Sequence, residues 1–590
     1  MEIKEFQNVL TSQNIDAYLI CNSDDHISEY IPDYFKEICF LTGYTGEGTL
    51  LITKEEAFIW VDGRYFIQAD IELKGQPIKV MKMGEPGVPT LIEFLKEKLN
   101  ENSILGFNGK MVSTSLAKDI INNVKVNRFE TTEDLVDVFW SNRPDMPYST
   151  LYVLEQFYAG KSYSSKITEV LDKMKEYKAD YLIVPELTSQ AWLFNLRGND
   201  ISHTPVFLGF TVITSKQTTL YIDEKKIDKI VSKYLDENEI QVKPYNDIYQ
   251  LFAKTTGKTI MIDLGHTNYE LYKSIEQGNT IIDTTDPITI LKSIKNDSEI
   301  KNTKKAQLKD CVTLTKFMYN LKNDYQKGRK MTEISVSDEL YEMRKQNKGF
   351  VDLSFDTISA WNGNAAMAHY SPTKENCAKI EGSGLLLIDS GAHYLEGTTD
   401  ITRTFALGNI SDEMKNSFTL VLKSHINLAK LRFMKGCKGI NLDVIARAPL
   451  WQMGLDYNHG TGHGIGYLLS VHEGPNCFRW KSTKSLTEMV ELKPGMITSN
   501  EPGLYFENKY GIRIESDVLV KEDETNEYGT FYSFDTLTYV PIDLDAINPK
   551  LLNSEEKEWL NNYHKKCYEL IAPKLTAKEK EWLANYTREI

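Results

Sequence analysis

The chain has 590 residues, of which 41% are hydrophobic and 26% are charged, and its formal net charge at pH 7 is −15. A chain of this length exceeds what one hydrophobic core can organise, so we expect three or four domains. The acidic balance argues against a nucleic-acid or an anionic-membrane partner, because both call for basic surface.

Three features of the sequence predict a cytoplasmic location. The N-terminus, MEIKEFQNVL, lacks the basic start, apolar core and cleavage site of a signal peptide. No uninterrupted apolar run approaches the roughly eighteen residues of a membrane span. The seven cysteines have no CxxC spacing, so they are expected to be reduced, mostly buried thiols.

Residues 1–145 and 146–300 are expected to form two related α/β domains. In the first, strand-like runs such as DAYLIC (16–21) alternate with helix-like segments such as FIQADIELK. The polar stretch SNRPDMPYS (141–149) marks its end. The second repeats the plan, since ADYLIV (179–184) echoes DAYLIC and FTVITSK (210–216) echoes TLLITKE (49–55). A diverged duplication explains the echoes, and chance similarity between βαβ units is the alternative.

Residues 301–590 are expected to form a third domain, which ends in a helical appendage at 551–590. The charged run IKNDSEIKNTKKAQLKD (294–310) leads into a long helical pattern and marks the boundary. In the appendage, Thr576 and Glu579 form a capping-box signal. One helical face, expected to pack or to make a dimer contact, carries Trp559, Leu560, Tyr563 and Cys567.

Two acids, Asp389 and Asp400, are predicted to face each other across a hairpin. The apolar run LLLID (385–389) ends in an acid, TTDITRTF (398–405) is rich in β-formers, and glycines mark the connecting turn. A register centred between Tyr394 and Leu395 places the two aspartates directly opposite one another, on one face of the sheet.

A second hairpin is predicted to pair two more acids. MITSNE (496–501) and GIRIESDVLV (511–520), with Asn508 at the apex, place Glu501 opposite Glu515. Opposed like charges destabilise a hairpin, and buried unpaired carboxylates raise their pKa or unfold the site. A bound cation resolves this conflict.

His463, in the glycine-rich run HGTGHGIG, completes a set of five candidate metal ligands. Four carboxylates and one imidazole suit Mn²⁺ best, with Co²⁺, Zn²⁺ or Mg²⁺ as substitutes. Four acids can neutralise two divalent ions, which bridging carboxylates hold about 3.5–4 Å apart. A single acid near a strand end is usually a solvated turn residue, so the prediction depends on the five together.

The motifs DSGAHYLEGTTDITRTF, HGTGHGIG, VHEGP, SNEPGLY and GIRIE resemble those of the pita-bread metallopeptidases, and within them the Xaa-Pro aminopeptidases (aminopeptidase P). The similarity continues through DDHISEYIPDYF, VDGRYFIQAD, AWLFNLRGNDI and KEWLNNYHKKC, and so covers nearly the whole chain. It implies the three-domain form of the family. The expected fold class is α/β, with two related creatinase-like N-terminal domains and a C-terminal α+β pita-bread domain. A homodimer is also implied.

The resemblance implies release of the N-terminal residue from peptides with proline in second position, by attack of a hydroxide held between two metal ions. The implied ligands are Asp389, Asp400, His463, Glu501 and Glu515. Glu501 is also the family's proposed general base. His369 matches a histidine that contacts the reacting centre or shuttles a proton, and His393 matches no family position. His459 and His472 match residues that contact the substrate backbone or stabilise the oxyanion, and Tyr505 and Arg513 match a hydrogen-bonded relay.

Two alternative functions stay open at this point. Prolidases share the metal set but cleave only dipeptides and usually have a single N-terminal domain, so the second such domain favours an aminopeptidase. A metal-free pita-bread binding module, of the histone-binding or scaffold kind, belongs to a different class. Such modules lose the ligand residues, whereas all five are present in this sequence.

Overall fold

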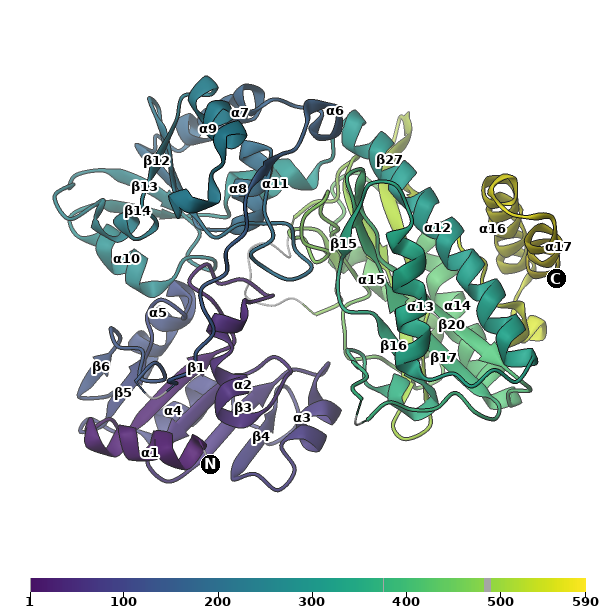
Figure 1. Ribbon diagram of the computed structural model, residues 1–590, viewed down its shortest axis with the longest axis horizontal. Coiled ribbons are helices and arrows are strands. Elements are labelled where there is room, and N and C mark those ends of the chain that lie inside the picture. Colours follow the sequence, from purple (N-terminus) through teal and green to yellow (C-terminus); the bar gives the residue numbers. More distant parts are fainter. Residues whose placement is uncertain (1, 139, 375, 482–489) are drawn as a thin grey trace. The chain divides into compact units, whose positions relative to one another are not determined.

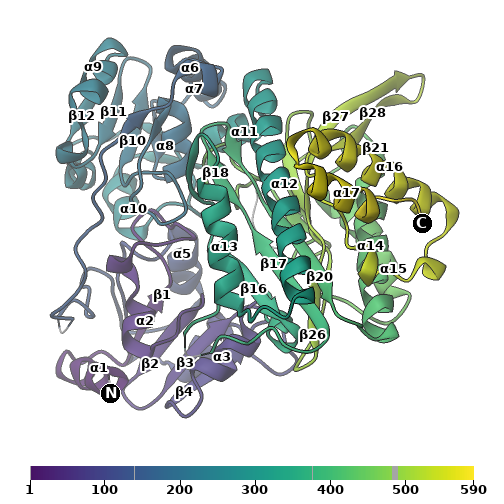
Figure 2. The same cartoon turned by 45° about the vertical axis from the view of Figure 1, so that its right-hand side comes forward.

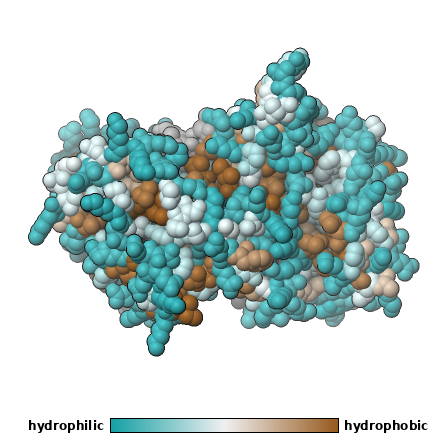
Figure 3. All heavy atoms as spheres, turned by 90° about the horizontal axis from the view of Figure 1, so that it is seen from above, coloured by the Kyte–Doolittle hydropathy of each residue, from teal (hydrophilic) through white to brown (hydrophobic). Residues whose placement is uncertain are grey.

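The computed structural model describes residues 2–138, 140–374, 376–481 and 490–590. The chain divides into two compact units (Figure 1). Unit 1 comprises Met1–Gln156 and Lys161–Ile288, and unit 2 comprises Phe157–Gly160 and Thr289–Ile590. Among the described residues, no helix is both long enough and apolar enough to cross a membrane. The face drawn in Figure 3 is mostly hydrophilic, and its hydrophobic residues form scattered patches.

Unit 1 contains two six-stranded sheets with the same strand order. The first runs β4-β3-β2-β1-β5-β6 and the second β12-β11-β10-β8-β13-β14. In each sheet a central strand pairs with an antiparallel neighbour on one side and a parallel neighbour on the other, β1 with β2 and β5, and β8 with β10 and β13. The central strands are apolar and largely buried because helices cover mixed sheets of this kind on both faces. The two sheets share one topology, as the echoed strings predict.

The strands of the first sheet are β1 (Ala17–Cys21), β2 (Thr49–Thr53), β3 (Ala57–Val61), β4 (Ile78–Lys82), β5 (Ile104–Phe107) and β6 (Arg128–Glu130). Those of the second are β8 (Tyr181–Val184), β10 (Phe210–Thr214), β11 (Thr218–Tyr221), β12 (Ile240–Lys243), β13 (Thr259–Ile262) and β14 (Thr280–Asp283), with a small pair β7 (Tyr152–Val153) and β9 (Leu196–Arg197). The helices before residue 294 are α1 (Glu2–Ser12), α2 (Glu37–Thr42), α3 (Phe66–Glu72), α4 (Leu91–Lys98), α5 (Thr114–Asn123), α6 (Gln156–Ala159), α7 (Tyr163–Glu176), α8 (Leu187–Phe194), α9 (Lys229–Glu237), α10 (Tyr269–Glu276) and α11 (Pro287–Ser293).

Unit 2 is built from short antiparallel sheets. The two largest have the orders β16-β17-β20 and β21-β28-β27-β24, and smaller ones have the orders β15-β18-β19, β22-β23 and β25-β26. The strands are β15 (Phe350–Leu353), β16 (Ile358–Trp361), β17 (Gly384–Ser390), β18 (Ala392–Tyr394), β19 (Gly397–Thr398), β20 (Ile401–Leu407), β21 (Arg432–Met434), β22 (Gly462–His463), β23 (Cys477–Phe478), β24 (Ile497–Asn500), β25 (Gly503–Phe506), β26 (Tyr510–Arg513), β27 (Ser516–Asn526) and β28 (Gly529–Thr536).

In the described part of unit 2, six α-helices surround these sheets. They are α12 (Asp297–Gln326), α13 (Glu333–Lys345), α14 (Asp412–Ala429), α15 (Gly439–Trp451), α16 (Ser554–Ile571) and α17 (Ala577–Tyr586). In Figure 2, α12 and α13 lie side by side across β16, β17 and β20. Helix α12 begins within the charged run because Asn296 and Glu299 form a capping box there. This long helix brings polar side chains behind the strands that carry the candidate ligands.

The C-terminal helices pack onto the core of unit 2. Leu560 and Cys567 are fully buried, and Tyr563 is 5% exposed. The Tyr563 hydroxyl donates to the Val540 carbonyl at 2.7 Å and accepts from Arg403 Nη2 at 2.8 Å. The capping box of Thr576 and Glu579 is present at the start of α17. This face of the appendage therefore packs against the core of unit 2.

Candidate metal centre

The hairpin that carries the two aspartates has a different register from the one predicted. Asp389 pairs with Thr402 across β17 and β20, and Tyr394 pairs with Gly397 at the tip. The turn therefore centres one position later than expected, and the prediction that Asp389 lies directly opposite Asp400 is wrong. Asp400 lies two residues before Thr402, so it is the diagonal neighbour of Asp389 on the same face.

The hairpin that carries the two glutamates has the predicted register. Gly503 pairs with Arg513 and Asn500 pairs with Ser516, so the strand ladders on either side of Glu501 and Glu515 share the register that places these two glutamates opposite each other. Asn508 has a φ of 59° at the apex, where a left-handed residue is needed. Arg513 ends β26 and Glu515 follows it before β27, so the predicted hairpin arm over 511–520 is interrupted and is not one continuous strand.

The interruption between these ladders ties both glutamates to other parts of the site. The Glu501 amide donates to the Thr461 carbonyl at 2.9 Å, and the Glu515 amide donates to the Thr402 carbonyl at 3.1 Å. Thr461 belongs to the loop of His463, and Thr402 belongs to the strand that follows Asp400. The backbone therefore brings three ligand-bearing segments together.

Two glycines let the loop of His463 approach closely. A Cβ at Gly462 would lie 1.9 Å from the Ser499 carbonyl oxygen, and one at Gly464 would lie 2.1 Å from the Glu473 carbonyl oxygen. Any side chain at either position would displace backbone. The lack of a side chain at these two glycines therefore lets the loop pack closely against neighbouring backbone.

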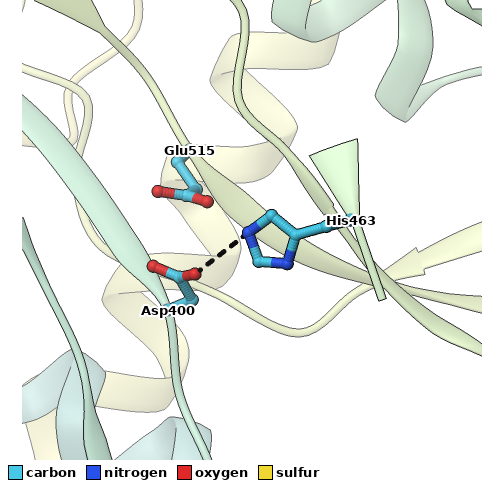
Figure 4. Close-up of side chains that lie close together, drawn as sticks. All are labelled: Asp400, His463 and Glu515. Carbon is cyan, nitrogen blue, oxygen red and sulfur yellow. Dashed lines mark ion pairs between the residues drawn. The ribbon is translucent and has the colours of Figure 1, made fainter. Parts of the chain in front are cut away.

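The side chains of Asp400, His463 and Glu515 converge (Figure 4). Each offers one ligand atom, and these atoms all lie within 4.8 Å of one another. His463 Nε2 lies 3.4 Å from Asp400 Oδ2 and 3.6 Å from Glu501 Oε1. Asp389 is held near this cluster by Arg513, whose Nη2 donates to Asp389 Oδ2 at 2.6 Å. Asp389 Oδ1 is buried and has no hydrogen-bond partner among the described residues.

Burial and mutual repulsion disfavour the charged forms of the carboxyl groups in this cluster. Burial, and then the charge of Asp389, raises the pKa of Asp400 well above its usual range. Burial, and then the charge of Asp400, likewise raises the pKa of Glu515 well above its usual range. Burial also raises the pKa of Glu501, against the opposing effect of His463. A hard oxygen and nitrogen donor set, with one orphaned carboxylate oxygen, fits divalent cations.

A hydrogen-bonded relay with a defined direction runs through Arg513, Tyr505 and His459. Arg513 Nη1 donates to the Tyr505 hydroxyl at 2.6 Å, and that hydroxyl lies 2.8 Å from His459 Nε2. His459 Nδ1 lies 2.7 Å from the Gly460 carbonyl, which can only accept. A neutral His459 therefore carries its proton on Nδ1 and accepts from Tyr505 at Nε2. Burial raises the pKa of Tyr505 to about 12, so this phenol stays neutral.

The other predicted histidines occupy distinct places. The His472 ring lies 4.3 Å from the His463 ring, centre to centre, at 78°. The segment of His369 reaches the relay, because the Ala368 carbonyl accepts from Arg513 Nη2 at 3.3 Å. His393 is fully buried in the hairpin turn, 3.0 Å from the Thr398 hydroxyl. This placement agrees with its lack of a family match.

Two polar residues beside the ligands escaped the sequence prediction. Thr402 donates to Glu515 Oε2 at 2.6 Å and accepts from Arg513 Nε at 3.2 Å. Asp517 is fully buried and accepts from the Asp400 amide at 3.3 Å. The available signal was the spacing in the sequence, because Thr402 follows Asp400 by two positions and Asp517 follows Glu515 by two.

A buried ion pair lies behind the aspartate hairpin. Arg344 Nε and Nη2 donate to the two Asp310 oxygens at 2.8 and 2.9 Å, with both side chains fully buried. Arg344 Nη2 also donates to the Ser390 carbonyl at 3.2 Å, and the Thr399 hydroxyl donates to Asp310 Oδ2 at 2.6 Å. The pair thus holds the residue after Asp389 and the residue before Asp400.

Comparisons with known proteins agree with this geometry. The model of metallopeptidase family M24 matches residues 301–522, and that of the C-terminal region of peptidase M24 matches 530–590. Models of the creatinase/prolidase N-terminal domain match 2–139 and 142–299. The expected fold class is therefore confirmed.

Proteins with similar sequences and structures are peptidases. Aminopeptidase P2 of Arabidopsis thaliana is 35% identical over 95% of this chain and 84% of its own length. A crystal structure of X-prolyl aminopeptidase from Caenorhabditis elegans, described as a cytosolic enzyme with a di-nuclear active site, has a TM-score of 0.94 and 32% identity over 100% of this chain and 99% of its own. The Xaa-Pro dipeptidase from Bacillus anthracis has a TM-score of 0.52 and 25% identity, and covers 65% of this chain and 99% of its own.

Proposed function

This chain belongs to metallopeptidase family M24, and on that premise we propose that it is an Xaa-Pro aminopeptidase, which releases the N-terminal residue from peptides with proline in second position. One observation carries the proposal. Asp400, His463 and Glu515 converge within 4.8 Å, beside Glu501 and Asp389, in a chain that matches an X-prolyl aminopeptidase from end to end.

Five residues would hold two divalent ions in this enzyme, namely Asp389, Asp400, His463, Glu501 and Glu515. When bound, such ions supply Lewis acidity to the scissile carbonyl and acidify a water molecule. The di-nuclear site described for the Caenorhabditis elegans structure supports two ions. The absence of a thiolate from the donor set favours Mn²⁺ as the native metal.

The chain's own residues transfer protons and orient the groups at the site. Glu501 takes a proton from the attacking water and returns one to the leaving nitrogen, which is the general-base role that the family resemblance implies for it. Arg513 fixes Asp389 on one side and Tyr505 on the other. Tyr505 in turn fixes the tautomer of His459. His472 is the candidate for stabilising the oxyanion, and His369 is the candidate for contacting the reacting centre or shuttling a proton.

The preference for proline rests on the names of the relatives. An Xaa-Pro bond has no amide hydrogen, and its proline φ is fixed near −65°, so a site shaped for it differs from that of a general peptidase. The Arabidopsis thaliana and Caenorhabditis elegans proteins support this specificity by their names.

Comparing a tripeptide with a dipeptide tests the proposal against the prolidase alternative. With Mn²⁺ present, we expect release of the first residue from Xaa-Pro-Yaa, and little or no cleavage of Xaa-Pro. Cleavage of the dipeptide alone would refute the choice. The dipeptidase from Bacillus anthracis covers only 65% of this chain, which favours the aminopeptidase.

A metal analysis tests the proposal against a binding module. We expect about two divalent ions per chain after reconstitution with Mn²⁺. Purified protein that binds no metal, and gains no activity with Mn²⁺, would favour the module.

We further propose a cytosolic homodimer. The description of the Caenorhabditis elegans enzyme as cytosolic supports the location, and the resemblance to aminopeptidase P supports the dimer. Light scattering tests the assembly, since one chain has a mass of 67.6 kDa. A monomeric mass would contradict the dimer.

A further inference from the structure

We propose that Asp517 is a positioning residue for the metal ligand Asp400, with Gln307 and Thr538 holding it in place. The inference rests on the proposed function, because it assigns Asp517 a task in the metal centre. Asp517 lies on β27, two residues after Glu515, and is fully buried. Burying a carboxylate costs free energy of folding unless it is hydrogen-bonded, so the groups that Asp517 contacts indicate its role.

The contacts form a closed ring of hydrogen bonds. Gln307 Nε2 and the Asp400 amide both donate to Asp517 Oδ2, the latter at 3.3 Å. The Asp517 amide donates to the Thr538 hydroxyl at 3.0 Å, and that hydroxyl donates to Gln307 Oε1 at 3.0 Å. Asp517, Gln307 and Thr538 are all fully buried.

The direction of every bond in the ring is determined. Thr538 has one proton, and it goes to Gln307 Oε1, so the Gln307 amide must present its nitrogen to Asp517. Asp517 Oδ2 therefore cannot turn away without breaking two bonds. The ring joins α12, β27 and the residues after β28 at one fixed point.

The ring acts on a single group of the metal centre, the main-chain amide of Asp400. Strand β20 begins at Ile401, so this amide lies just before the strand ladder. Asp517 supplies the acceptor and thereby fixes the backbone from which the Asp400 side chain projects. Hydrogen-bond partners of metal ligands commonly change metal affinity about 10–100-fold when they are removed.

A purely structural role makes different predictions. If the ring only tethers α12 to the sheet, breaking it lowers the melting temperature and leaves metal affinity unchanged. If Asp517 acts by its charge, Asp517→Asn weakens metal binding as much as Asp517→Leu does. If Asp517 acts by position, asparagine retains an oxygen at Oδ2 and hence most of the function, whereas leucine does not.

The test measures Mn²⁺ affinity by competition with a chelator, together with the visible spectrum of the Co²⁺-loaded protein. We expect Asp517→Leu to bind Mn²⁺ about 10–100-fold more weakly and to change the Co²⁺ spectrum. Asp517→Asn should stay within about threefold of wild type by the same reasoning. Gln307→Leu should also weaken binding, although it leaves β27 intact. Thr315→Val is the matched control, because this hydroxyl on the same helix donates to the Cys311 carbonyl and, among the described residues, contacts no member of the ring.

Several outcomes would overturn the inference. Wild-type Mn²⁺ affinity in Asp517→Leu would do so, as would equal losses in Asp517→Asn and Asp517→Leu. If Asp517→Leu does not fold, Gln307→Leu decides, and wild-type affinity there refutes the ring's role. If wild-type protein binds Mn²⁺ but cleaves no Xaa-Pro peptide, the proposed function is refuted. The Mn²⁺ affinities of the variants still test the inference about Asp517 in that case.

Discussion

Removing the Tyr505 hydroxyl should slow peptide cleavage without emptying the metal site. Arg513 donates to this hydroxyl at 2.6 Å, and the hydroxyl lies 2.8 Å from His459 Nε2. In Tyr505→Phe, both groups lose that partner. Asp389 keeps its own bond to Arg513 Nη2 at 2.6 Å, so the ligand stays in place and the metals stay bound.

The structure sets the size of the effect. A hydrogen bond to a charged group contributes about 1.5–3 kcal/mol, and about 1.4 kcal/mol of barrier changes a rate tenfold. The loss of the Arg513 bond, together with a less constrained His459, therefore predicts that kcat/KM falls roughly 10- to 150-fold. The main loss should appear in kcat, because the relay orients groups at the reacting centre.

The assay measures kcat and KM on an Xaa-Pro-Yaa peptide, with metal content determined on the same samples. Tyr510→Phe is the control, since Tyr510 lies on the same hairpin but its hydroxyl contacts Ser417 and Glu413 instead. Its activity should match that of wild type. A Tyr505→Phe enzyme within twofold of wild type, or one that has lost its metal, would refute the reasoning.

The remaining predictions concern the ligands, His369 and pH. Asp400→Asn and Glu501→Gln should both abolish turnover, and Asp400→Asn should also lower the metal content. Peptide assays check the turnover and elemental analysis checks the metal content. His369→Ala should reduce kcat more than it reduces metal binding, and an unchanged kcat would show that the role is misassigned. Burial raises the pKa of Asp400 and of Glu515 well above the usual range, so the metal-free native state binds more protons than the unfolded state, and its stability falls as pH rises above the ordinary carboxyl range near 4. The gain in melting temperature on adding Mn²⁺ should therefore grow from pH 5 to pH 8 in thermal scans with and without chelator, and a flat or shrinking gain would contradict the burial argument.

The sequence predicted the second hairpin better than the first for a physical reason. A left-handed asparagine at a single apex fixes the register around Asn508. In the first hairpin, glycines at 391 and 397 lie on either side of the turn and allow more than one register. A tertiary contact decides between them, because β18 also pairs with β15 and the Leu395 amide bonds the Gly349 carbonyl at 2.8 Å.

The residues that the sequence prediction missed have partners far away along the chain. Gln307 and Asp517 are 210 positions apart, and Asp310 and Thr399 are 89 apart. Periodicity places such residues on a buried face but does not name their partners. Motifs identified the candidate ligands, whereas the side chains that orient them required the three-dimensional fold.

The strand ladder is interrupted at Glu501 and Glu515, and this interruption bears on how the enzyme gains and loses its metal ions. Main-chain bonds to Thr461 and Thr402 join these segments without the help of any ion, so we expect the backbone of the metal-free site to keep its shape. Loading then needs only the arrival of ions, with little reorganisation of the chain. A chelated sample should accordingly recover on simple remetallation, without passing through an unfolded state.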